Sequence, residues 1–525
     1  MSDPHFLELT IPSQSTPAEL AEGLEQALGL RPAGRHRSSL VYYDSFDWRL
    51  RRSGFEFAVE LADTALSAIL AGPGGERHEP VGIAIPPRFA QDLPAAAWRG
   101  RVAELLYPRA LLPRVEISLA REEFLLEGEE GILLLRAVLE SPALDRAGNP
   151  LPLTARLRLD PIKGHRKTFR HIAERLRREF GLEPAESTLL SEALAASGIT
   201  PADPSALPCI RFDPKLRADA AAKQILTALS ATLAINEAGT RAETDIEFLH
   251  DFRVAVRRTR AALGQIKEVF PDATVRRYAS GFGELGRITG EPRDLDVYLL
   301  DFERHREELP LASRPALDPL RALLASRSEA AHARLNSYLE SSAYRRLIQG
   351  WERFLSLPVP RRPRSRNAAV PIRELADRRI WKLYRRVVED GLAIAAESPA
   401  EQVHELRKTA KKLRYLMEFF RGLYPPEKIA PLIKILKGLQ EHLGEYQDAH
   451  AQIAQLMSYA DELRQTGAPT ATLLALGALL DRRYVWEGQL REGFPECFAE
   501  FAEESHRRKF RHLFKPAAAD AGPSK

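Results

Sequence analysis

One basic pattern occurs twice in the chain, and this internal repeat constrains the fold more than any other feature. The stretch HDFRVAVRRTR begins at His250, and HELRKTAKKLR begins at His404. In both, the histidine is followed by basic residues three, seven, eight and ten positions later. The same offset of 154 residues relates GEPRD at Gly290 to GEYQD at Gly444. Self-similarity at a fixed offset predicts two copies of one structural unit.

Each copy is expected to form a helix with one basic face and one apolar face. A helix advances about 100° per residue, which places the residues at positions three, seven and ten beside the histidine. The two basic faces are His250, Arg253, Arg257 and Arg260, and His404, Arg407, Lys411 and Arg414. The two apolar faces are Phe252, Val256, Leu263 and Ile266, and Leu406, Ala410, Leu413, Met417 and Phe420.

Stacked cations on one helix face repel each other, because side chains three and four residues apart are neighbours. The repeated cations therefore favour the binding of an anion that would neutralise them. Two alternatives stay open. The faces could simply be solvated, as most charged helix faces are. They could also be neutralised by acids of the turn that we expect after each helix, which are Asp294, Asp296 and Asp448.

The histidines lack the sequence context of a metal site. No HExxH pattern is present, and the two cysteines, Cys209 and Cys497, provide neither a disulfide framework nor a zinc site. We therefore predict no metal, no cofactor and no catalytic residue. His250 and His404 are expected to donate hydrogen bonds to an anion. The sparse use of cysteine favours a reducing, cytoplasmic location.

The first 160 residues predict mainly strands, since they alternate or run apolar between Gly, Pro and Asp breaks. The expected strands are FLELTI, SSLVYYD, FEFAVEL, RVEISLAREEFLL, GILLLRAVLE and TARLRLD. Two helices are expected among them. One begins at Thr16, which with Pro17 and Glu19 forms a helix start, and the other covers about residues 165–180. The pattern predicts an α+β domain built around an antiparallel sheet or tunnel-like barrel.

The rest of the chain predicts helices. The proline-rich segment 200–214 is interpreted as a linker, and beyond it long stretches of helical period are separated by short turns. The expected divisions are an α+β domain at 1–199, the linker, an all-α domain of two pseudo-symmetric bundles at 215–515 and a disordered tail at 516–525. The two repeats of the all-α domain are placed at about 215–356 and 372–515.

The positive charge of the chain is concentrated in its helical part. Residues 1–200 hold 24 Lys and Arg against 28 Asp and Glu, which leaves 52 against 44 for the remainder of the 76 and 72 in the chain. A basic surface attracts polyanions, so the helical part is the candidate for a polyanionic partner. No secretory signal and no membrane span are predicted, because the apolar runs are too short.

With these motifs, and with RDLD at Arg293–Asp296 and LQEHLGEYQDAH at Leu439–His450, the segment 215–515 resembles the CHAD family. This family is named for a helical domain with characteristic histidines. The resemblance implies two bundles whose basic faces line one groove, the binding of inorganic polyphosphate and association with polyphosphate granules. It implies ligand contacts from His250, Arg253, Arg257, Arg260, His404, Arg407, Lys411 and Arg414, with Arg258, Lys408 and Lys412 beside them. Asp294 and Asp448 are expected to order the turn.

The first 200 residues resemble the CYTH family, the triphosphate-tunnel fold, through YYDSFDWRLRRSG at Tyr42–Gly54 and EPAESTLLSEAL near Glu183. That family's chemistry needs carboxylates for a divalent metal and basic residues for a triphosphate. Here Glu8 remains from the opening acidic motif, but residues of other types stand at most matching positions. These are Phe6, Thr10, Ala58, Glu60, Arg156, Arg158 and Thr188. We therefore expect a scaffolding or dimer-forming domain without triphosphatase activity.

The preferred reading is a polyphosphate-binding protein that is not an enzyme. An alternative is a CYTH-type triphosphatase or polyphosphatase to which the helical domain supplies substrate. A nucleic-acid-binding protein is a third alternative, which the basic faces disfavour because no aromatic residue lies among the cations for base stacking. Self-association into a homo-oligomer is left open by the sequence.

Overall fold

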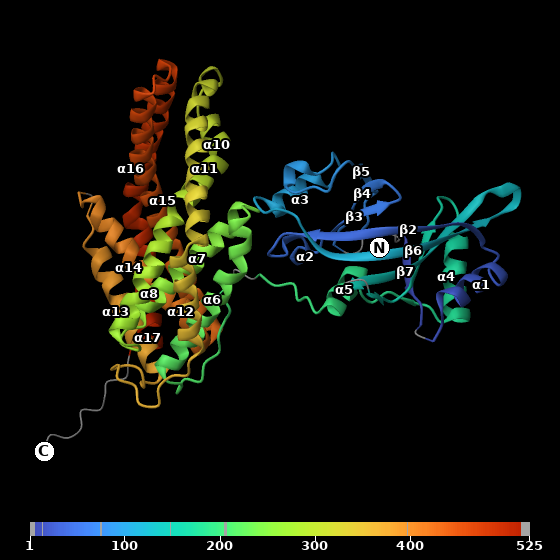
Figure 1. The fold of residues 1–525 in the computed structure, drawn as a ribbon, viewed down its shortest axis with the longest axis horizontal. Coiled ribbons are helices and arrows are strands. Elements are labelled where there is room, and N and C mark those ends of the chain that lie inside the picture. The colour runs from blue at the N-terminus through green and yellow to red at the C-terminus, as the bar shows by residue number, and fades with distance from the viewer. Residues whose placement is uncertain are drawn as a thin grey trace. The chain divides into compact units, whose positions relative to one another are not determined.

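The computed structural model describes residues 6–12, 14–73, 76–146, 149–203, 207–395 and 397–515. The tail expected at 516–525 lies outside these residues, as does part of the expected linker. The chain divides into two compact units, Met1–Pro204 and Ser205–Lys525, which are described one at a time (Figure 1). The first is built around an antiparallel sheet and the second is helical, so the predicted fold class is confirmed.

The sheet unit contains ten strands in one antiparallel sheet. They are β1 (Leu7–Thr10), β2 (Arg31–Asp44), β3 (Glu56–Ala62), β4 (Ala65–Ala71), β5 (Val81–Ile83), β6 (Leu112–Glu127), β7 (Leu133–Arg146), β8 (Asn149–Pro152), β9 (Arg156–Pro161) and β10 (Glu183–Pro184). The strand order is β10-β1-β9-β7-β6-β2-β3-β4-β5, with β8 paired to β7. The sequence missed β4, β5, β8 and β10, which are short or lack a clear alternation.

Five α-helices belong to the sheet unit: α1 (Pro17–Gln26), α2 (Arg49–Arg52), α3 (Arg99–Leu106), α4 (Arg166–Phe180) and α5 (Leu189–Ser197). The predicted start of α1 is confirmed, because Thr16 and Glu19 form a reciprocal capping box. Leucines on alternate positions of β1 and β9 pack with side chains of α1 and α4 in an apolar cluster. Since side chains alternate along a strand, Glu8 and Arg158 face the opposite side.

The helical unit is formed by α6 (Ala218–Arg241), α7 (Ile246–Gln265), α8 (Asp272–Ile288), α9 (Gly290–Leu300), α10 (Phe302–Glu307), α11 (Asp318–Glu340), α12 (Ser342–Ser356), α13 (Ile372–Leu392), α14 (Ala400–Phe420), α15 (Pro426–Gln465), α16 (Thr470–Phe501) and α17 (Glu504–Phe514). The repeat is visible in the starts of these helices. α6 and α13, α7 and α14, and α8 and α15 each begin 154 residues apart. Within the described residues, none of the helices combines the length and hydropathy that crossing a bilayer requires.

A short antiparallel bridge between Arg217 and Pro371 joins the beginnings of the two repeats. The amide of Ala218 donates to the carbonyl of Val370 at 2.9 Å, and the amide of Ile372 donates to that of Leu216 at 2.8 Å. A second pair runs from Asp219 to Ala368 at 3.1 Å and from Arg373 to Pro214 at 3.2 Å. In each pair, adding 154 to both numbers of one bond gives the other. The two repeats are therefore related by an approximate two-fold axis.

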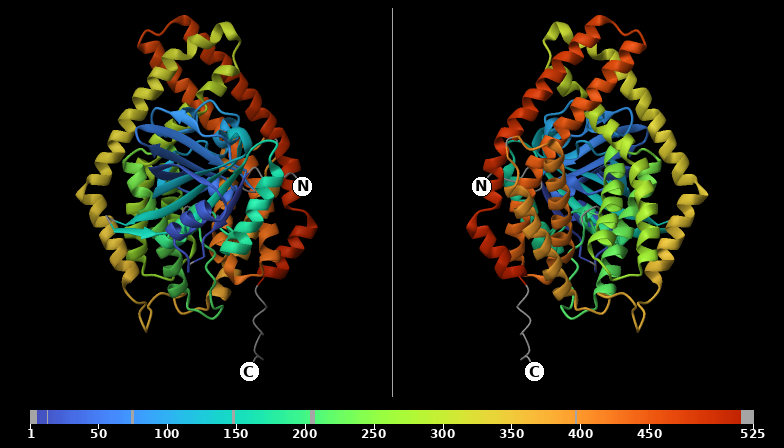
Figure 2. Two further views of the ribbon diagram at one scale, coloured as in Figure 1. Left: turned by 90° about the vertical axis from the view of Figure 1, so that its right-hand side faces the viewer. Right: turned by 90° about the vertical axis from the view of Figure 1, so that its left-hand side faces the viewer.

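Two apolar cores stabilise the helical unit. The larger core draws on both repeats, from α6, α7 and α8 as well as α13, α14 and α15. A smaller core joins α9, α10 and α11 to the distal parts of α15 and α16, where these long elements converge at one end of the unit (Figure 2). Residues of the basic motifs lie on the helices between these cores.

One sequence expectation about the repeat is wrong. The segments GEPRD and GEYQD were expected to form a turn, but Gly290 begins α9 and Gly444 lies inside α15. Pro292 falls in the first turn of α9, where its missing amide hydrogen costs no helical hydrogen bond. Asp294 and Asp448 are therefore helical residues, and their carboxylates point towards the basic faces, as the distances below show.

Candidate functional site

The helices α7 and α14 place the repeated cations on their polar sides. Asp245 caps α7 by accepting hydrogen bonds from the amides of Glu247 and Phe248. The predicted apolar faces are confirmed. Their members are buried in the larger core: Phe252, Val256, Leu263 and Ile266 of α7, and Leu406, Ala410, Leu413, Met417 and Phe420 of α14. The cations must therefore point away from that core.

The first cation after each histidine occupies the same position in both repeats. Arg253 donates to the carbonyl of Gly286 at 3.1 Å and lies 3.9 Å from Asp294. Arg407 lies 3.7 Å from Asp448. Glycine is required opposite Arg253, since a Cβ at Gly290 would approach its Nη1 to 2.9 Å. The conserved spacing between these motifs thus reflects a packed guanidinium group beside a carboxylate.

The two basic faces converge on one place. Arg257 of α7 is close enough to Arg407 and Lys411 of α14 to lower the pKa of both, although burial is the larger cause. Together with Arg407, these effects bring the pKa of Lys411 to about 8. On α7, burial and neighbouring cations that include Arg257 and Arg260 lower the pKa of Arg253. The site is therefore rich in cations that repel one another.

The two acids beside the site do not neutralise it fully. Burial raises the pKa of Asp294 and of Asp448, and the charge of Asp448 raises that of Asp294 further. This mutual effect shows that α9 and α15 also approach each other here. Asp296, the third acid considered, lies elsewhere, 2.8 Å from His332 of α11.

The histidines lie at the N-terminal ends of the two faces, and both are half-buried. The Nδ1 atom of His404 is 2.5 Å from Oε1 of Gln447, so this ring nitrogen donates to the amide oxygen. Since a backbone or side-chain acceptor on one ring nitrogen fixes the tautomer, the Nε2 atom of His404 is left as an acceptor while the ring is neutral. It becomes a donor towards an anion only when the ring is protonated.

The flanking residues divide into free-standing and internally paired cations. Arg257, Arg260 and Lys412 are exposed. Lys408 is paired with Glu405 at 2.7 Å on the surface. Arg258 and Arg414 both lie 3.6 Å from Glu418. The sequence did not identify Glu418, because only the packing of α7 against α14 brings it to Arg258.

Residues 224–457 match the family model of the CHAD domain. The helical unit contains a CHAD domain. The match includes both basic motifs and both acids beside them, so all predicted site residues lie within the CHAD domain. Among curated proteins, no sequence matches this chain.

Solved structures similar to the CHAD domain include the CHAD domain of the plant Ricinus communis. It is 24% identical, with a TM-score of 0.46, over 57% of this chain and 96% of its own. PptA from Streptomyces chartreusis is 18% identical, with a TM-score of 0.43, over 54% and 99%. For the sheet unit, a protein from Hippeastrum described as a candidate adenylyl cyclase with dominant triphosphatase activity is 15% identical, with a TM-score of 0.27, over 37% and 96%.

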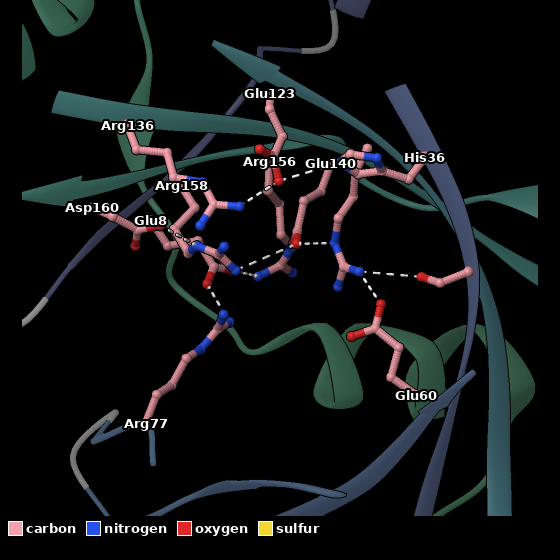
Figure 3. Close-up of polar contacts among 12 residues, drawn as sticks. Glu8, His36, Glu60, Arg77, Glu123, Arg136, Glu140, Arg156, Arg158 and Asp160 are labelled. Carbon is pink, nitrogen blue, oxygen red and sulfur yellow. Dashed lines mark hydrogen bonds and ion pairs between the residues drawn. The ribbon is translucent and has the colours of Figure 1, made fainter. Parts of the chain in front are cut away.

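The sheet unit has a second cluster of charged residues, in which arginines and acids neutralise each other (Figure 3). Arg156 is almost fully buried and donates to Glu8 at 2.6 Å and to Glu192 at 2.9 Å. Glu8 also accepts from Arg77 at 2.9 Å. Across the same face, Arg121 binds Glu60 and Glu140, and Arg158 binds Asp160.

This cluster does not fit the divalent metal that a triphosphate-tunnel domain would hold. Both carboxylate oxygens of Glu8 already bind arginine, and Glu140 lies between Arg121 and Arg158. Among the described residues, His, Cys, Asp and Glu side chains form no group of three that could hold a metal ion. Phe6, which stands at an expected acidic position, packs its ring 4.7 Å from the Arg77 guanidinium.

Proposed function

We propose that the CHAD domain binds inorganic polyphosphate between α7 and α14. The observation that carries this proposal is the approach of Arg257 to Arg407 and Lys411, which brings the cations of the two repeats into one site. A folded chain maintains such mutual repulsion at a cost in stability. A bound polyanion would remove that cost, because each phosphate carries negative charge into the region of lowered lysine and arginine pKa.

The chemistry of the side chains fits a linear phosphate polymer. The guanidinium groups of Arg253 and Arg407 can bind phosphate oxygens in pairs, and Lys411 adds a point charge. Among the described residues, Nε of Arg407 and of Arg414 is buried without a hydrogen-bond partner, so both guanidinium groups retain a donor. A long chain can contact both faces at once, and each face then tethers it for the other.

Two further features belong to the same proposal. The basic faces carry no Phe, Tyr or Trp side chain among their cations, and nucleic-acid grooves that lack sequence specificity use such side chains for stacking. A phosphate polymer without bases is therefore the better ligand. A protein that binds this polymer would collect on polyphosphate granules in the cytoplasm.

Titration calorimetry of the intact chain with long-chain polyphosphate tests the proposal, with single-stranded DNA of equal charge as competitor. We expect binding that weakens steeply between low and high salt, by analogy with counterion release from nucleic acids. We expect DNA to compete poorly. Binding that is flat with salt, or that DNA displaces at equal charge, would contradict the proposal.

A further inference from the structure

Glu418 breaks the symmetry between the two basic faces. The 154-residue offset relates Glu418 of α14 to Gly264 of α7, so the first repeat has no side chain at the position where the second carries a carboxylate. The Glu418 side chain is 16% exposed. It lies one helical turn beyond Arg414, the last cation of the second basic face. An acid at this place reduces the positive charge of the site on one side only.

The carboxylate of Glu418 is shared between the two repeats. It lies 3.6 Å from Arg258 of α7 and 3.6 Å from Arg414 of α14. Both distances exceed those of hydrogen bonds. Among the described residues, Oε2 of Glu418 and Nε of Arg258 and of Arg414 are buried without a hydrogen-bond partner. The three groups are therefore held by charge, and one carboxylate serves two guanidinium groups.

We propose that Glu418 takes the place that a phosphate group of the bound polymer would otherwise occupy beside Arg258 and Arg414. It thereby closes one end of the basic site and limits the number of phosphates that the site engages. This inference rests on the proposed binding of polyphosphate. Its chemical basis is that a carboxylate and a phosphate compete for the same guanidinium donors.

The pseudo-symmetry provides a matched pair of variants. Glu418→Gln removes the charge and keeps the shape of the side chain. Gly264→Glu installs the missing acid in the first repeat, where Lys412 and Arg260 stand at the positions equivalent to Arg258 and Arg414. A Cβ at Gly264 meets no atom within 4 Å, and glutamate favours a helix more than glycine does. The Gly264→Glu variant is therefore expected to fold.

The affinities of the parent chain and both variants are compared by titration calorimetry with long and with very short polyphosphate, with thermal unfolding as the folding control. Glu418→Gln should bind long chains about threefold to tenfold more tightly, because one repulsive charge is lost from a half-buried site. Gly264→Glu should weaken long-chain binding by a similar factor. Short chains, which the cations nearer the histidines hold, should change less in both.

The outcomes separate this inference from the proposed function. If the parent chain does not bind polyphosphate, the proposed function fails. If the parent binds and folded Glu418→Gln binds long chains equally or less tightly, Glu418 only clamps α7 to α14 and the inference is wrong. Should Glu418→Gln fail to fold, Gly264→Glu decides, since unchanged long-chain affinity in that variant overturns the inference.

Discussion

Lys411 is the residue whose protonation should report binding most directly. Burial and the cations Arg407 and Arg257 lower its pKa to about 8 in the free protein. A bound phosphate stabilises the protonated form and raises this pKa. At pH 8, binding of polyphosphate should therefore take up roughly half a proton. Calorimetry in two buffers of different ionisation enthalpy measures the uptake.

The Lys411→Arg variant is the control for this measurement, because it keeps the charge and should abolish the uptake at pH 8. An uptake that persists in this variant would assign the proton to another group. The lowered pKa also affects folding. Below about pH 8 the folded protein pays for a charged lysine among cations, and this destabilisation disappears as pH rises towards the ordinary lysine value.

Arg156 holds the charged cluster of the sheet unit together. It is 1% exposed and binds Glu8 and Glu192. Arg156→Met should lower the free energy of unfolding by about 3 kcal/mol, because it leaves two carboxylates without a buried partner. Hydrogen exchange of the β1 and β9 amides measures the loss.

The matched control for Arg156 is Arg136→Met. The Arg136 side chain is 42% exposed and binds Glu123, and exposed pairs contribute less than about 1 kcal/mol. Equal effects of the two substitutions would show that burial of Arg156 is not what makes it important. The size of the difference between the two variants is the quantity to compare.

At the scale of elements, α7 and α14 should contribute alike to binding. Arg253→Glu with Arg257→Glu on α7, and Arg407→Glu with Lys411→Glu on α14, should each weaken long-chain binding roughly tenfold to a hundredfold. Very short chains, which cannot span both helices, should lose less. Titration calorimetry with both chain lengths measures the effect, and circular dichroism checks folding.

A reversal of the same charge on α13 is the control for these variants. Arg385 and Arg386 are 62% and 65% exposed and pair with Glu389 and Asp390 along the same helix. Arg385→Glu with Arg386→Glu should leave binding nearly unchanged. If either variant of α7 or α14 folds and still binds long chains as tightly as the parent, the shared site is wrong.

The sequence predicts these elements well where a periodic pattern decides the structure. The basic and apolar faces of α7 and α14 follow from helical period alone, and the buried residues agree with it. The turn expected at Gly290 and Gly444 was wrong, because glycine beside Glu-Pro suggests a chain reversal. Packing of the Arg253 guanidinium against Gly290 explains the glycine instead. Glu418 was missed because its partner Arg258 lies on another helix.

At the scale of the whole molecule, the two units should separate when the chain is cut between Pro204 and Ser205. Each unit has its own apolar cores. The helical unit alone should then bind polyphosphate as the full chain does. The sheet unit alone should release no phosphate from triphosphate with Mg²⁺ or Mn²⁺, because arginines hold the carboxylates that a metal would need. Phosphate-release assays test this.

Metal-dependent turnover by the sheet unit that Glu8→Ala abolishes would contradict this prediction. The loss of the tunnel motif at Phe6 and Thr10 could be predicted from the sequence. That arginines occupy the remaining acids could not, because Arg77 and Arg156 reach Glu8 from separate parts of the fold. The sequence thus predicted the missing groups, and the fold shows what replaces them.

The paired hydrogen bonds at Arg217 and Pro371 have a consequence for how the protein responds to dilution. Two identical subunits related by a two-fold axis could form the same site, but they would dissociate at low concentration and lose it. Here both halves belong to one polypeptide and share one core. The affinity of the site for its ligand should therefore not depend on how much of the protein a cell makes.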